Sequence, residues 1–180
     1  MVHILGIVGS PRRKGNTDVL VSHVLAGAEG RGATTETLFL NDLTIRECDG
    51  CHACWQGKRC PKADDMAGLY ARIEAADGIV FGTPVYWYGP TGILKLLIDR
   101  FVYFNCPENR PQIAGTRVAI AVPYEDTDAE TVRPLLEFFK KSFAYLEMNC
   151  IGQIVVPGVT IRGEVAQKPD CLQAAFELGV

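Results

Sequence analysis

Four cysteines lie within thirteen residues of this chain, and their spacing is that of a ligand set. Cys48, Cys51, Cys54 and Cys60 form the pattern C-x2-C-x2-C-x5-C, followed by Pro61. The pattern is close to C-x2-C-x2-C-x3-C-P, a run that binds iron–sulfur clusters. Four thiolates also suit tetrahedral zinc, but zinc sites usually pair two C-x2-C units across a longer gap. The run therefore favours a cluster, with zinc and bare or disulfide-forming thiols as the alternatives.

A second chemical signal is the segment G-S-P-R-R-K-G-N-T at residues 9–17, between a strand pattern and a helix pattern. A loop entering a helix presents free N–H groups and the positive end of the helix dipole to an anion. Neither the P-loop nor the Rossmann glycine pattern is present, and no C-x5-R phosphatase run exists. The alternative is an ordinary loop that only starts a helix. We predict a phosphate site made by side chains and backbone of Ser10, Arg12, Lys14, Gly15, Asn16 and Thr17.

A third signal is the aromatic segment T-P-V-Y-W-Y-G-P-T at residues 83–91. Three consecutive aromatic residues cannot all point into a core, although core packing is the alternative for some of them. Ring faces and backbone N–H groups at such a turn can hold a flat heteroaromatic ring. Together with the phosphate loop, the segment predicts an FMN site, with the ring surrounded by Pro84, Val85, Tyr86, Trp87, Tyr88 and Gly89.

The elements that position these segments alternate between strand and helix patterns, which is typical of a parallel sheet. Strands are expected at 3–8, 34–40, 78–81, 118–122 and 151–156. Helices are expected from 16 or 17 to about 28, from 64 or 65 to 74, at 90–101, from about 127 to 146 and at 169–178. We predict an α/β, flavodoxin-like three-layer sandwich with strand order 2-1-3-4-5. In that order the first and third strands flank the switch point, so the phosphate and aromatic loops face each other.

Composition places further bounds on the chain. Its 180 residues predict one FMN-binding domain, 1–180, that carries a cysteine-rich loop at 41–63. A net charge of −3 gives no indication of nucleic acid or an anionic membrane as partner. We find no signal peptide pattern and no apolar stretch long enough for a membrane span. Seven cysteines in this context are typical of the reducing cytoplasm.

The combined motifs resemble the NADPH-dependent FMN reductase family of flavodoxin-like proteins. The match is carried by the phosphate loop and by P-V-Y-W-Y-G-P-T-G-I-L-K-L-L-I-D-R. The cysteine run, followed by Asp64-Asp65-Met66, narrows the resemblance to the iron–sulfur flavoproteins. That resemblance implies FMN, a [4Fe–4S] cluster on the four cysteines, and a homodimer or homotetramer in which cluster and flavin of neighbouring subunits lie close. The segment Pro123–Asp126 departs from the family pattern, and we assign it no flavin contact.

We therefore expect an FMN-dependent oxidoreductase that passes electrons from ferredoxin or NAD(P)H to an unidentified acceptor through FMN and the cluster. The cofactors carry the chemistry, so no protein acid or base is assigned. Two alternatives are a plain NAD(P)H-dependent FMN or quinone reductase without a cluster, and a non-enzymatic electron carrier or redox sensor. We expect Cys106, Cys150 and Cys171 to be buried and to act as small apolar residues. His3 and His23 are expected to have structural roles.

Overall fold

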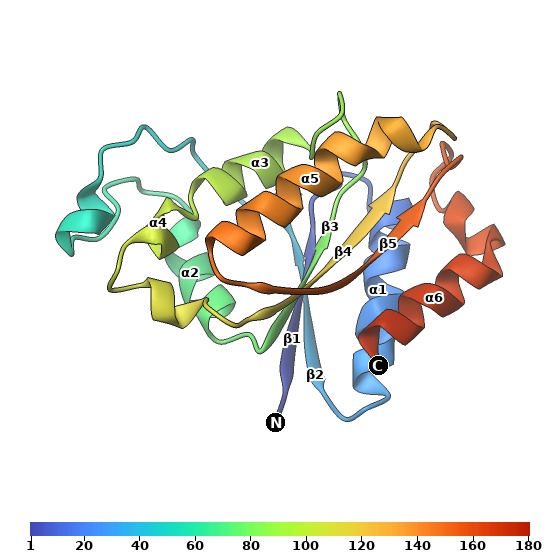
Figure 1. The fold of residues 1–180 in the computed structure, drawn as a ribbon, viewed down its shortest axis with the longest axis horizontal. Coiled ribbons are helices and arrows are strands. Elements are labelled where there is room, and N and C mark those ends of the chain that lie inside the picture. Colours follow the sequence, from blue (N-terminus) through green and yellow to red (C-terminus); the bar gives the residue numbers. More distant parts are fainter.

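A five-stranded parallel sheet in the order β2-β1-β3-β4-β5 organises the molecule. The computed structural model describes residues 1–180, and Figure 1 shows the sheet crossing the centre of the molecule. The strands are β1 (His3–Val8), β2 (Thr34–Phe39), β3 (Gly78–Gly82), β4 (Arg117–Pro123) and β5 (Asn149–Val156). The predicted strand order and fold class are confirmed.

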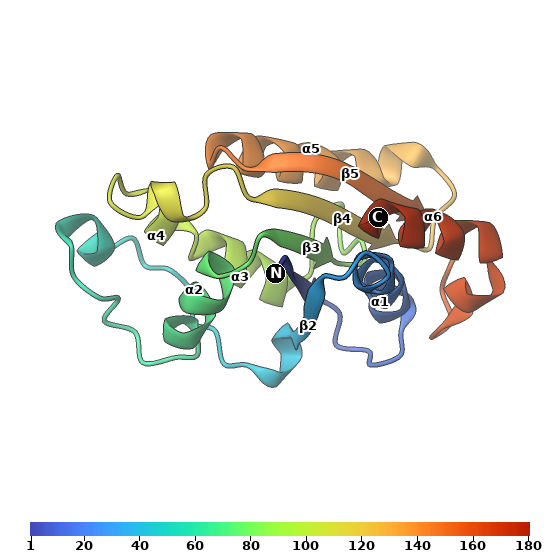
Figure 2. The same cartoon turned by 90° about the horizontal axis from the view of Figure 1, so that it is seen from below.

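Helices cover both faces of the sheet. They are α1 (Asn16–Glu29), α2 (Met66–Glu74), α3 (Gly92–Asp99), α4 (Val102–Asn105), α5 (Ala129–Tyr145) and α6 (Pro169–Gly179). Figures 1 and 2 show α1 and α6 together on one face, while α2, α3, α4 and α5 lie on the other. None of these helices is long and apolar enough to cross a membrane.

Two apolar cores hold the layers together. The larger contains 27 buried residues under α2, α3 and α5, including Phe81 of β3 and Phe139 of α5. The smaller contains 12 and joins α1 and α6 to the sheet through residues such as Leu20 and Val24. Each such side chain contributes about 1.5–3 kcal/mol when it leaves water. The burial of Leu20, Val24 and Ala28 confirms the predicted inner face of α1.

Two helix ends differ clearly from the sequence prediction. The helix expected at 90–101 stops at Asp99, and α4 follows as a separate turn. The break occurs because Arg100 and Phe101 donate to carbonyls three residues back, at 3.1 and 3.0 Å, which tightens the chain. Helix α5 is capped by Asp128 and not by Thr127. The helix runs through Pro134 without a break, in agreement with its predicted range.

The structure places the remaining cysteines and histidines in different settings. Cys106 is fully buried, as expected, but Cys150 is exposed because it lies on the edge strand β5. His3 bonds to Thr34 through Nδ1 at 3.2 Å, and His23 Nδ1 lies 2.8 Å from the Val19 carbonyl. Both histidine rings therefore make contacts within the fold.

Candidate functional site

The loops after β1 and β3 are fixed to each other at the switch point. The Gly9 N–H donates to the Gly82 carbonyl at 2.8 Å, and the Thr91 hydroxyl donates to the Gly9 carbonyl at 2.6 Å. The Thr91 N–H donates in turn to the Thr83 hydroxyl at 3.1 Å. Because Thr83 and Thr91 are fully or almost fully buried, these bonds hold both loops rigidly at one edge of the sheet.

A cleft of about 150 Å³ lies between these loops. Its lining is supplied by the loops that follow β1, β3, β4 and β5: Ser10, Arg12, Asn16, Thr17, Pro84, Val85, Tyr86, Pro123, Tyr124, Glu125, Val159 and Thr160. Seven of the twelve residues predicted for cofactor binding thus meet in one cleft. Lys14, Gly15, Trp87, Tyr88 and Gly89 do not line it.

The start of α1 gives this cleft the character of an anion site. Gly15 is the N-cap residue, and no side chain caps the helix. The N–H groups of Asn16, Thr17 and Asp18 donate to no acceptor in the chain. A Cβ on Gly15 would lie 2.7 Å from the Arg12 carbonyl oxygen, so only glycine permits this tight turn. Free N–H groups at the positive end of a 14-residue helix favour a phosphate.

The three consecutive basic residues of the phosphate loop point in different directions. Arg12 lines the cleft and donates to the Thr160 carbonyl at 3.3 Å. Arg13 forms an ion pair with Asp42 and stacks over the ring of Phe39 at 3.9 Å. Lys14 is exposed, and its φ is +55°. Only Arg12 of the three is therefore placed to face a bound anion.

Asn16 lines the cleft, but both ends of its amide are already engaged. Its nitrogen donates to the Ile161 carbonyl at 3.0 Å, and its oxygen accepts from the Val165 N–H at 3.1 Å. The side chain thus ties α1 to the loop between β5 and α6. Glu164 folds the same loop by accepting from the N–H groups of Thr160 and Ile161, and these bonds lower the pKa of its carboxyl.

The aromatic segment forms a two-residue turn. Tyr86 and Gly89 exchange both backbone hydrogen bonds, at 2.9 and 3.0 Å. Trp87 and Tyr88 between them have φ values of +48° and +63°, which are costly for bulky residues. Trp87 is 96% exposed. Strain of this kind is often found at ligand sites.

A second hollow, of about 490 Å³, continues the cleft on the side of the aromatic turn. It shares Val85, Tyr124 and Glu125 with the cleft and adds Trp87, Tyr88, Asp126 and Thr131. The predicted ring residues Trp87 and Tyr88 therefore line this adjoining hollow and not the cleft itself. Gly89 lines neither space.

The loop after β4, to which the sequence analysis assigned no flavin contact, is part of both spaces. Tyr124 is buried, and burial together with the carboxylates of Asp126 and Asp128 raises the pKa of its hydroxyl. The pKa of Asp126 is lowered by donation from the Asp128 N–H, the Thr131 hydroxyl and the Thr127 N–H. The signal available in the sequence was positional, since β4 ends at the same edge of the sheet as β1 and β3.

The cysteine loop consists of a stem and a lobe. The stem pairs residues 44–49 with 61–65, and the lobe is residues 50–60. Thr44 and Asp65 are joined by two bonds, at 2.7 and 3.1 Å, and Lys62 forms an ion pair with Asp49 at 3.0 Å. Figure 1 shows the lobe projecting from the end of the molecule occupied by α2 and α4.

All four cysteines of the run line one small cavity of about 30 Å³. Tyr70, Arg100, Val102 and Tyr103 form its inner wall. The thiols are free, and no three His, Cys, Asp or Glu side chains in the chain converge closely enough to hold a single metal ion. Burial, and next the proximity of Cys106, raises the pKa of Cys54.

Comparison with known proteins identifies the family. Residues 2–158 match the family model described as NADPH-dependent FMN reductase. The chain belongs to this family. It is therefore an FMN-dependent oxidoreductase, similar to NAD(P)H-dependent flavin reductases, as the sequence motifs predicted. The match covers the phosphate loop, the aromatic loop and the whole cysteine loop.

Individual relatives agree with this assignment. An iron-sulfur flavoprotein from Methanocaldococcus jannaschii is 33% identical over 136 residues, which are 76% of this chain and 70% of that protein. A putative NAD(P)H-dependent FMN-containing oxidoreductase from Bacillus subtilis is 27% identical over 176 residues, 96% of this chain and 93% of that one. The structure of an NAD(P)H:quinone oxidoreductase from Methanothermobacter marburgensis superposes with a TM-score of 0.75 at 16% identity, covering 99% of this chain and 93% of that one. At that identity the likeness shows the fold alone.

Proposed function

We propose that this protein passes electrons between a reduced donor and an acceptor through FMN and a [4Fe–4S] cluster. The observation that carries the proposal is the convergence of all four cysteines of the run on one cavity, in a chain whose family binds FMN. FMN exchanges electrons in pairs or singly, whereas an iron–sulfur centre takes one at a time. The donor is NAD(P)H or ferredoxin, and the family match favours the nicotinamide.

The cleft supplies the groups that FMN requires. The N–H groups at the start of α1, with Ser10, Thr17 and Arg12, would hold the phosphate. Pro84, Val85 and Tyr86, with the adjoining hollow under Trp87, would hold the ring. Tyr88 would contact the ring from the adjoining hollow, and Lys14, Gly15, Asn16 and Gly89 would act in the same site by shaping its loops.

The spacing of the four cysteines along the chain favours a cluster over zinc. Tetrahedral zinc with bonds of about 2.3 Å needs sulfur atoms about 3.8 Å apart. No three ligating side chains converge in that way. A four-iron cluster is larger than one ion, so its cysteine sulfurs stand farther apart around a shared space. Cys48, Cys51, Cys54 and Cys60 all line one cavity of about 30 Å³, and the loop would have to open around a four-iron centre held there.

The two sites are separate within one chain. No residue lines both the FMN cleft and the cysteine cavity. In Figures 1 and 2 the lobe lies at the opposite end of the molecule from α1 and α6. Electron exchange between the two centres would therefore use the flavin of a neighbouring subunit, and we propose a homodimer or homotetramer.

The same separation favours a second candidate, a plain NAD(P)H-dependent FMN or quinone reductase. Because the cleft shares no side chain with the cysteine cavity, flavin chemistry does not require a cluster. The two candidates differ in one measurable property, which is the metal content of the protein.

The deciding experiment is an anaerobic absorption spectrum with iron, sulfide, zinc and FMN measured on the same sample. We expect FMN plus about four iron and four sulfide per chain. Cys54→Ser should lose iron and keep FMN, because Cys54 lines the cysteine cavity and not the cleft. Cys150→Ser is the matched control, since this exposed cysteine lies on β5 outside the lobe.

Two results would contradict the proposal. FMN without iron or sulfide in protein kept free of oxygen would establish the plain reductase. One zinc per chain, lost in Cys54→Ser, would establish a zinc site on the same cysteines.

A further inference from the structure

Arg100 is a buried charge directly beneath the cysteine loop. Its side chain is only 2% exposed, and the side chain of its partner Asp64 is not exposed at all. Arg100 follows α3 directly, so its position is set by the packed core and not by the loop. Removing a guanidinium from water costs several kcal/mol unless a partner and further hydrogen bonds compensate. The ion pair with Asp64 and the hydrogen bond to the Arg46 carbonyl supply this compensation.

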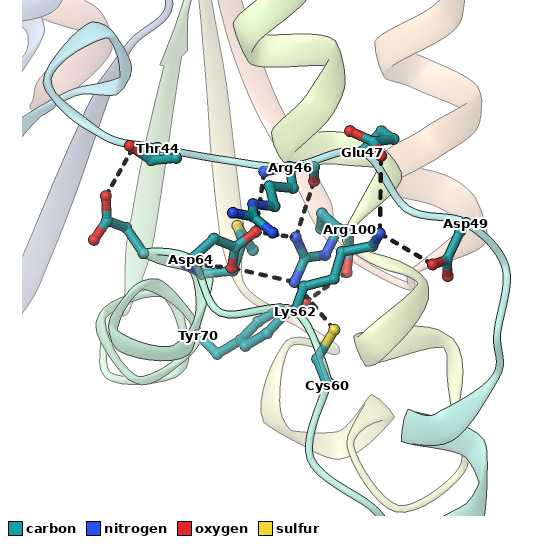
Figure 3. A network of polar contacts seen from close by, with 11 residues as sticks. Thr44, Arg46, Glu47, Asp49, Cys60, Lys62, Asp64, Tyr70 and Arg100 are labelled. Carbon is teal, nitrogen blue, oxygen red and sulfur yellow. Dashed lines mark hydrogen bonds and ion pairs between the residues drawn. The ribbon is translucent and has the colours of Figure 1, made fainter.

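The guanidinium contacts both sides of the stem and one of the four cysteines. Its Nη1 donates to the Arg46 carbonyl at 2.9 Å and to the Asp64 carboxylate at 2.5 Å. Its Nη2 donates to the sulfur of Cys60 at 3.2 Å. Figure 3 shows these three partners converging on Arg100, with Arg46 on one side of the loop and Cys60 and Asp64 on the other.

Asp64, the ion-pair partner of Arg100, is itself fixed by backbone hydrogen bonds. Its carboxylate accepts from the N–H groups of Arg46 at 3.0 Å and Met66 at 3.2 Å. Burial acts to raise the pKa of Asp64, but the Arg100 ion pair and these two donors outweigh it, so the pKa is lowered. The pair stays charged, and the fork of the guanidinium keeps a fixed direction.

We propose that Arg100 is a positioning residue for the cluster: with Asp64 it closes the stem before a cluster is bound, and it presents a charged N–H donor to the Cys60 sulfur. This inference rests on the proposed function. A hydrogen bond to a ligand sulfur is one of the features that set an iron–sulfur potential. A donor that carries positive charge favours the more negative, reduced cluster. Arg100 therefore raises the reduction potential.

The first test uses protein without a cluster and measures amide hydrogen exchange in the stem. In Arg100→Lys the ammonium keeps the charge but cannot reach the carboxylate, the Arg46 carbonyl and the sulfur together. We expect exchange at residues 44–49 and 61–65 to be at least tenfold faster than in the wild type. Arg72→Lys is the matched control, because Arg72 pairs with Glu36 away from the loop. Equal exchange in both variants and the wild type would overturn the stem-closing role.

The second test measures the midpoint potential of the cluster in protein that contains it. In Arg100→Lys the Cys60 sulfur loses the guanidinium N–H donor. The equilibrium constant for reduction should fall about tenfold, so the midpoint potential should be about 59 mV lower for one electron. Equal iron content with an unchanged potential would overturn the sulfur contact. Wild-type protein without iron would instead contradict the proposed cofactor, and the exchange experiment would still decide the stem-closing role.

A second variant guards against loss of folding in Arg100→Lys. Arg100→Met combined with Asp64→Leu removes both charges, a replacement that buried ion pairs often tolerate. The same fall in potential is expected from this variant, because it also lacks a donor to Cys60. An unchanged potential in both variants would contradict the proposal.

Discussion

At the scale of single residues, Arg12 and Arg13 show how neighbours in sequence acquire different roles. The predicted phosphate site included Arg12 and left out Arg13, although residue type alone does not distinguish them. In the structure Arg12 lines the cleft, while Arg13 is paired with Asp42 and stacked on Phe39. The direction of each side chain depends on the end of β2, which the local sequence pattern does not specify.

We predict that Arg12→Gln weakens FMN binding about tenfold, because one charged contact to the phosphate at an exposed position is worth about 1.4 kcal/mol. Arg13→Gln should change the dissociation constant little. The measurement is a fluorescence titration of apoprotein with FMN and with riboflavin, which has no phosphate. Riboflavin should bind both variants as it binds the wild type. Equal losses for FMN and riboflavin would show that Arg12 acts on the ring or on folding.

The cysteine site also combines residues that the local sequence indicates with one that it does not. Their spacing predicted a shared centre, and the structure brings all four to one cavity. Arg100 was not predicted, because it lies forty residues beyond Cys60 and reaches the sulfur only through the packing of α3 against the loop. Contacts between segments so distant in sequence leave no local pattern.

At the scale of elements, all five strands and the main helices could be predicted because their apolar runs and periodicities reflect burial. The ends of the helices were harder to predict. The apolar spacing runs on from α3 into α4, with Phe101 and Phe104 both buried, so one helix was expected where the backbone makes two. The loop after β4 was missed for another reason: its place in the cleft follows from the sheet order and not from its residues.

The aromatic turn is the element in which local preference and site geometry conflict. Two-residue turns with positive φ at both positions favour Asn-Gly, yet Trp87 and Tyr88 occupy them here. The left-handed conformation costs about 1–2 kcal/mol per residue. Such a cost is retained where the exposed rings serve a ligand.

We predict that Trp87→Asn combined with Tyr88→Gly raises the free energy of unfolding of the apoprotein by about 1–2 kcal/mol, because the turn strain is relieved. The same variant should bind FMN more weakly, since it lacks both rings that line the adjoining hollow. Urea unfolding and flavin titration measure the two effects. A variant that is less stable and binds FMN normally would show that the rings pack for stability instead.

At the scale of the whole molecule, the two candidate centres are separate, because no residue of the subunit lines both the FMN cleft and the cysteine cavity. This separation leads to a prediction about assembly. Light scattering should give the mass of a dimer or tetramer, and electron exchange between cluster and flavin should slow when the protein is diluted until it dissociates. Anaerobic stopped-flow absorption over a range of protein concentrations measures the rate. A monomer with a rate independent of concentration would contradict the assembly.

The contacts within the stem bear on whether the cysteine loop could be moved into another protein of the same fold. Because Thr44–Asp65 joins the stem at its base and Asp49–Lys62 joins it next to the lobe, the segment 44–66 supplies several of the contacts that fold it. A recipient of the same architecture would have to supply chiefly an arginine after its third helix and an apolar wall such as Val102 and Tyr103. The loop is then a transferable module, by which a redox centre could be gained or lost in descent without rebuilding the sheet.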